Sequence, residues 1–253
     1  MYGSYNWYDK VKRYFTFSKS EIQGLIVAIL VIGFMFGIDD GRATIHVIDS
    51  IWVQHLIGMI LIVALAFIVH VVIQKVYALK LGFKAQFKPW YYGIMLALLV
   101  VLVSRGSLIL ILPGGVVLSM MAFHRIGYFR YGKNVWTYGF VGMAGPIANL
   151  VLAFIFKLIS LTALNNIFIE KAIIINILMA IFTALPIPPL DGSRMFFAYP
   201  LAYFMFFGSV LVASILMLLG LTSFFSLIFY SLISGVVLML VLNLLFMKLW
   251  DNK

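Results

Sequence analysis

Three short segments of the chain carry polar side chains in otherwise apolar surroundings. His70 and Gln74 lie four residues apart in a long apolar run, so an imidazole and an amide share one helix face. A Gly- and Ala-rich stretch precedes Asn149, whose amide can donate a hydrogen bond to a neighbouring helix. A Pro-rich stretch ends at Asp191, a lone carboxylate. Because charge or imidazole inside a bilayer is costly, these residues are the candidates for a functional site.

The composition describes the medium that surrounds these residues. Of the 253 residues 64% are hydrophobic and 10% are charged, and the mean hydropathy is +1.13. These values exclude a soluble globular protein and a disordered one, and predict a polytopic membrane protein. The net charge of +10 indicates basic loops on the cytoplasmic side rather than a nucleic-acid partner. The chain has no Cys, which excludes disulfides and thiolate metal sites.

The elements that must position the candidates follow from the apolar runs. Residues 1–20 are basic and aromatic and predict an interfacial segment, and residues 21–253 predict a single transmembrane domain. A capping box of Ser18 and Glu21 is expected to start the first span. The basic loops predict that both termini lie on the cytoplasmic side. The expected location is a prokaryotic cell membrane. About six or seven transmembrane helices are expected, from spans near residues 21–37, 52–79, 91–104, 140–161, 171–188, 196–220 and 223–249.

In this order, the three polar segments resemble the site-2 protease family of intramembrane zinc metalloproteases, in its compact form without PDZ or CBS domains. That family carries His-Glu-x-x-His, then Gly-Pro-x-x-Asn, then Leu-Asp-Gly behind a Pro-rich helix end. The resemblance implies a site-2 protease-like core over about residues 52–194, a C-terminal helix pair at 196–249, and a short membrane-embedded β-hairpin around Pro113. The matching scaffold positions are Gly145, Pro146, Asn149, Pro188, Pro189 and Gly192.

The resemblance also assigns a role to each polar position. In the family two His and one Asp hold zinc, and the Glu takes a proton from the zinc-bound water. The first His ligand matches His70 and the Asp ligand matches Asp191. The general base falls on Val71, the second His on Gln74, and an Asn eight residues before the Asp falls on Thr183. Three of the family's five functional positions have therefore changed.

These changes predict a protease fold that has lost its protease activity. No carboxylate lies between Asp49 and Glu170, so nothing on the His70 span replaces the missing base. Loss of a general base alone slows a reaction about 10²–10⁴-fold. His70 and Asp191 become vacant ligand positions, and no cofactor is expected. Because an unpaired buried carboxylate is costly, Asp191 is expected to contact His70 or Lys75 instead of a metal.

Three functions remain open at this point. The preferred one is a non-catalytic protein of the lipid bilayer that binds or regulates the transmembrane segments of other proteins. The first alternative is an active zinc protease with rewired ligands, namely His70, Asp191 and His124. The second is a lipid, ion or small-molecule pathway that uses His70, Lys75 and Asp191 as relay groups.

Overall fold

A computed structural model describes residues 2–39, 49–120, 135–162, 166–220 and 223–251. The chain forms nine helices and two strands within these residues. Their bounds, in chain order, are α1 (Tyr2–Tyr14), α2 (Lys19–Gly37), α3 (Ser50–Lys80), β1 (Phe83–Pro89), α4 (Tyr91–Val103), β2 (Gly114–Met120), α5 (Val135–Thr162), α6 (Ile167–Thr183), α7 (Asp191–Ala198), α8 (Pro200–Leu218) and α9 (Phe224–Asp251).

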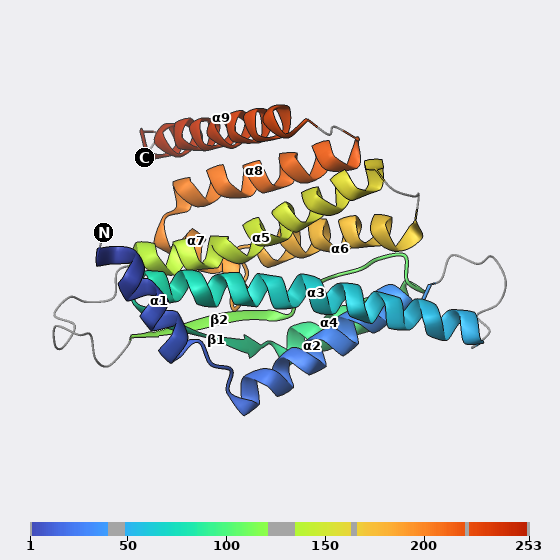
Figure 1. Cartoon of the computed structure of the whole chain (residues 1–253). Coiled ribbons are helices and arrows are strands. Elements are labelled where there is room, and N and C mark those ends of the chain that lie inside the picture. The colour runs from blue at the N-terminus through green and yellow to red at the C-terminus, as the bar shows by residue number, and fades with distance from the viewer. Residues whose placement is uncertain (1, 40–48, 121–134, 163–165, 221–222, 252–253) are drawn as a thin grey trace.

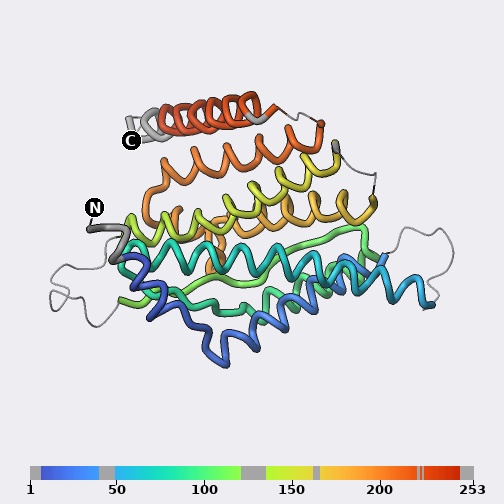
Figure 2. Tube along the Cα trace, viewed as in Figure 1, coloured from blue at the N-terminus to red at the C-terminus, as the bar shows by residue number. Residues whose placement is uncertain are grey.

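The long helices run side by side as a bundle (Figure 1). Packing joins α2 to α3, α3 to α5, α5 to α6, and α8 to α9. The helix α9 lies at one side of the bundle, beyond α8 (Figure 2). The strand β1 packs against both α2 and α3, and β2 pairs with β1. The N-terminal helix, the C-terminal end of α9 and the Lys80 end of α3 lie at the same end of the bundle (Figure 1).

Five helices are long and apolar enough to cross a membrane, namely α2, α3, α5, α8 and α9. These make the chain a polytopic helical membrane protein. The apolar helix α4 has 13 residues and α6 has 17, which lie at or below the length that a typical bilayer requires. The predicted capping box is confirmed: Ser18 Oγ accepts a hydrogen bond from the Glu21 N–H, and the Ser18 N–H donates one to Glu21.

The span expected at about 196–220 is confirmed as α8, although this helix starts four residues later than expected. The chain breaks at Tyr199, whose backbone is extended with φ −160° and ψ 91°, and α8 starts at Pro200. The residue before a proline is pushed away from helical geometry, because the proline ring collides with its backbone. The residues before Tyr199 therefore form a separate short helix, α7, with Asp191 at its first position.

The expected local hairpin near Pro113 is wrong. The strand β2 pairs antiparallel with β1, and the whole of α4 lies between them in sequence. In β1 apolar residues alternate with polar ones, and Phe83, Ala85 and Phe87 are buried. That period of two is typical of a strand with one buried face. Val116 and Leu118 of β2 add to the same apolar core beneath α3.

Candidate functional site

The candidate site is a buried chain of three polar side chains from three helices. His70 of α3 and Asp191 of α7 contact each other directly, with 2.9 Å between Nε2 and Oδ2. The amide Nδ2 of Asn149 on α5 lies 3.1 Å from His70 Nδ1. With this amide as the donor, Nδ1 accepts and Nε2 carries the proton donated to Asp191. The expected contact of Asp191 with His70 is therefore confirmed.

Close helix packing brings these side chains together. A side chain added at Gly145 would collide with His70 Nε2 and would start 2.7 Å from Gln74 Nε2. A side chain at Gly142 would start 2.5 Å from the Asp191 carbonyl oxygen. Glycine at these two positions lets α5 pass directly over the His70 face of α3 and the start of α7. Pro146 lies inside α5 beside this crossing.

The second carboxylate oxygen of Asp191 holds the edge of the sheet. The Val116 N–H donates to Asp191 Oδ1 over 3.2 Å. The register pairs Val116 with Phe87, whose own N–H donates to Glu21 Oε1 over 2.9 Å on the other edge of the sheet. Glu21 in turn pairs with Lys75 at 2.7 Å. Two carboxylates thus cap the two edges of one strand pair, and each is tied to α3 by a cation or an imidazole.

The structure places Lys75 away from Asp191, in a second buried polar cluster. Besides Glu21, its Nζ donates to the Thr16 carbonyl oxygen over 2.8 Å and lies 3.9 Å from the centre of the Phe17 ring. Lys75 follows Gln74 by one residue, which turns it about 100° around α3 toward α2 and β1. Of the two partners expected for Asp191, this turn of the helix directs Lys75 to Glu21 and leaves His70 as the residue that contacts Asp191.

The three positions that the resemblance assigns to the general base, the second His and the Asn are all buried. Val71 packs in the main apolar core, among residues that include Phe67 and Val116. Gln74 is fully buried, and neither its amide oxygen nor its nitrogen has a hydrogen-bond partner among the described residues. The Thr183 hydroxyl donates to the Met179 carbonyl oxygen of its own helix over 2.6 Å. None of the three side chains supplies a group that can accept a proton from water in the way a carboxylate does.

The Pro-rich segment connects α6 to α7 and delivers Asp191. Its Pro188–Pro189 peptide bond is cis. The Pro189 carbonyl oxygen lies against Gly115, where a side chain would start 2.5 Å away. Gly192 lies against the Ala184 carbonyl oxygen at the end of α6, so closely that any side chain there would collide. This close contact fixes the start of α7, and with it the Asp191 side chain, against β2.

Arg194 is a polar residue of this region that the sequence interpretation missed. It is half-buried on α7, three residues after Asp191, and its Nη1 is enclosed without a hydrogen-bond acceptor among the described residues. Its charge lies close enough to interact with that of Asp191. The only signal in the sequence is the spacing of three, which puts Arg194 close to Asp191 on a helix.

The described donor set does not fit a protease zinc site. Such sites use three protein ligands and leave the fourth position for water. His70 and Asp191 supply one imidazole and one carboxylate, and in the described part of the chain no group of three His, Asp or Glu side chains could hold a metal ion. Gln74 would add only a neutral amide, a weak zinc ligand. His124, the ligand of the rewired alternative, lies outside the described residues.

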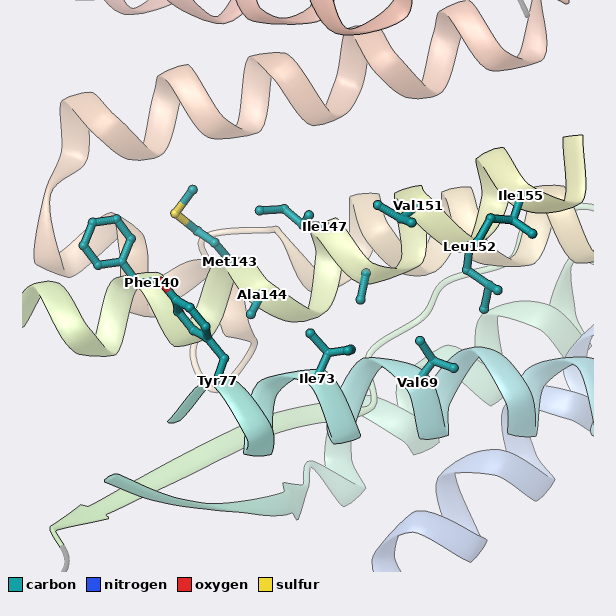
Figure 3. A pocket seen from close by; sticks show the side chains of 11 residues that line it. Val69, Ile73, Tyr77, Phe140, Met143, Ala144, Ile147, Val151, Leu152 and Ile155 are labelled. Carbon is teal, nitrogen blue, oxygen red and sulfur yellow. The ribbon is translucent and has the colours of Figure 1, made fainter. Parts of the chain in front are cut away.

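An apolar groove lies between α3 and α5, beside the polar chain (Figure 3). Its volume is about 500 Å³. The α3 side contributes Val69 and Ile73, each next to His70 or Gln74 in sequence, and the α5 side includes Ala144, Ile147 and Val151. A groove of this size and polarity can take an apolar side chain or lipid chain close to the buried polar residues.

Comparison with known proteins adds one relative. It comes from Methanocaldococcus jannaschii and is named "Putative zinc metalloprotease MJ0611". It is 29% identical over 184 residues, which cover 71% of this chain and 85% of the relative. The chain is thus similar to a protein named as a zinc metalloprotease. No protein-family model matches the chain, and no solved structure matches it.

Proposed function

We propose that this chain is a membrane protein of the site-2 protease fold that does not cut peptide bonds and instead binds or regulates transmembrane segments of other proteins. The direct contact between His70 Nε2 and Asp191 Oδ2 carries the proposal. In this contact the imidazole proton occupies the side of His70 that faces the carboxylate, and Asn149 occupies the other ring nitrogen. Both ring nitrogens are then engaged by protein groups.

The capping of the sheet supports a structural role for the same residues. Asp191 holds the Val116 edge as Glu21 holds the Phe87 edge. Because Asp191 binds β2 to α7 through the Val116 N–H, this carboxylate contributes to the fold without any metal. The exposed apolar helices and the similarity to a protein named as a metalloprotease support a partner that itself lies in the membrane. We place the protein in a prokaryotic cell membrane, with both termini cytoplasmic.

Elemental analysis of the purified protein tests the loss of the metal. The unmodified protein is expected to hold far less than one zinc per chain. A variant with Val71→Glu, Gln74→His and Thr183→Asn is expected to gain zinc, and to lose it again when His70→Ala is added. Near-stoichiometric zinc in the unmodified protein would overturn the proposal and favour the rewired protease, a reading that the name of the archaeal relative supports.

Photo-crosslinking tests the binding of membrane partners. A photoreactive residue replaces Ile147 in the groove or Phe197 on α7, which are 44% and 67% exposed. Leu99 of α4 is 56% exposed on another part of the bundle and serves as the control position. Membrane-protein adducts at Ile147 or Phe197 that are missing at Leu99 are expected. Equal labelling at all three positions would contradict a dedicated binding surface.

A further inference from the structure

Arg194 is a cation without a full complement of partners. Its Nη1 is enclosed and has no acceptor, and no ion pair joins Arg194 to any carboxylate within the described ranges. A charge that is partly enclosed in this way is costly when it stays unpaired. Whether the protein itself neutralises the charge of Arg194 depends on the polar groups around it.

The carboxylate of the neighbouring Asp191 already accepts hydrogen bonds from other groups. Asp191 Oδ1 and Arg194 Nη2 both lie within 3.5 Å of the point where a Gly115 side chain would start, so the two groups are neighbours. However, Asp191 accepts hydrogen bonds from the Val116 N–H and from His70. The Tyr138 hydroxyl donates to the Leu118 carbonyl oxygen, so its proton faces the strand. The guanidinium of Arg194 therefore has N–H groups, those of Nη1 among them, without an acceptor among the described residues.

Glycines leave room around the guanidinium. A side chain at Gly115 would start 3.5 Å from Arg194 Nη2, and one at Gly142 would start 3.4 Å from Arg194 Cβ. The next turn of α7 brings Phe197 to the same side of the helix, three residues on and 67% exposed. Arg194 thus lies between α5 and β2, on the same side of α7 as the exposed Phe197.

The depth of Arg194 favours one kind of anion. Arg194 lies beside Asp191, which contacts His70, ten residues before the Lys80 end of α3. The basic loops predict that the Lys80 end of α3 lies at the cytoplasmic interface. On this predicted topology, ten helical residues place the site about 15 Å inside, which is half of the roughly 30 Å hydrocarbon core. Lipid phosphates stay in the interfacial layer, whereas an acidic side chain on a transmembrane segment reaches this depth. Such intramembrane charges pair with one another.

We infer that Arg194 receives the carboxylate of an acidic residue in the transmembrane segment of a partner, which lies against α7. This inference rests on the proposed function and names the chemistry of the partner. It predicts that segments with a Glu or Asp about ten residues from their basic flank are preferred over segments with an amide there.

Two synthetic transmembrane peptides of Leu and Ala test this preference. Both carry a Lys pair at one end, and ten residues inside it one has Glu and the other has Gln. Dissociation constants are measured by fluorescence transfer between labelled peptide and labelled full-length protein in detergent micelles. The unmodified protein is expected to bind the Glu peptide about 10- to 100-fold more tightly than the Gln peptide, since hydrogen bonds to charged groups contribute about 1.5–3 kcal/mol.

Three variants separate charge, position and folding. Arg194→Gln should remove the preference, and Arg194→Lys should keep part of it. Lys157→Gln removes the same charge about 22 Å along α5 from Gly142 and should leave the preference intact. A preference that survives Arg194→Gln, or two peptides that bind the unmodified protein equally or not at all, would overturn the inference. Partner adducts at Phe197 would still support the proposed function in that case.

Discussion

Exchanging the amide and the carboxylate around His70 gives the sharpest test of the site. In the protein, Asn149 Nδ2 donates to His70 Nδ1, and Nε2 donates to Asp191. Asp191→Asn places an amide where the acceptor was, so His70 meets a donor on both sides unless one amide turns. The double variant Asn149→Asp and Asp191→Asn reverses every donor and acceptor along the chain. It keeps the net charge, and the carbonyl oxygen of the new amide can still accept from the Val116 N–H.

The magnitude follows from the buried contacts that each variant loses. Asp191→Asn removes one charge-assisted hydrogen bond and leaves a buried group unpaired, which destabilises the fold by about 2–4 kcal/mol. Asn149→Asp alone adds a second buried carboxylate beside His70 and should have a similar cost. The double variant is expected within about 1 kcal/mol of the unmodified protein. Because the residues share one network, the coupling energy should exceed about 2 kcal/mol.

Thermal unfolding in detergent, followed by the fluorescence of the five Trp residues, measures these effects. A loss of 2–4 kcal/mol lowers the midpoint by about 5–15 °C in a chain of this size. Nitrogen NMR of labelled His gives a second readout, since it shows which ring nitrogen of His70 carries the proton. The proton should move from Nε2 to Nδ1 in the double variant. If the double variant is destabilised by as much as the two single variants together, the proposed order of donors and acceptors from Asn149 through His70 to Asp191 is refuted.

Two further predictions concern the packing around the site. Gly145→Ala should lower stability by about 1–3 kcal/mol in the same unfolding assay, because its Cβ would collide with His70 Nε2; an unchanged midpoint would mean that α5 does not approach α3 this closely. Lys75→Met should cost about 3–5 kcal/mol by leaving Glu21 buried without its cation, and adding Glu21→Gln should recover part of the loss. Strictly additive losses would show that the two side chains are independent.

Much of the architecture was accessible from the sequence because it depends on local patterns. Apolar runs of span length predicted the long helices, and the spacing of Ser18 and Glu21 predicted the start of α2, since capping bonds join residues three apart. The costly polar residues His70 and Asp191 stood out from the same runs. The cost of an unpaired buried carboxylate predicted that Asp191 contacts either His70 or Lys75, and the structure shows the contact with His70, 121 residues away.

The partner strand of β1 and the ion-pair partner of Lys75 could be identified only from the tertiary structure, because they depend on which elements pack together. The alternation in β1 marks a strand, but the partner strand lies beyond α4, and pairing across such a distance has no local signal. Lys75 follows Gln74 by one residue, yet the turn of the helix gives it to Glu21 and not to Asp191. The sequence by itself determined which side chains must find partners in an apolar medium. The packing of α3 against α2, α5 and the sheet determined which partners they found, because a helix distributes successive residues to different neighbours.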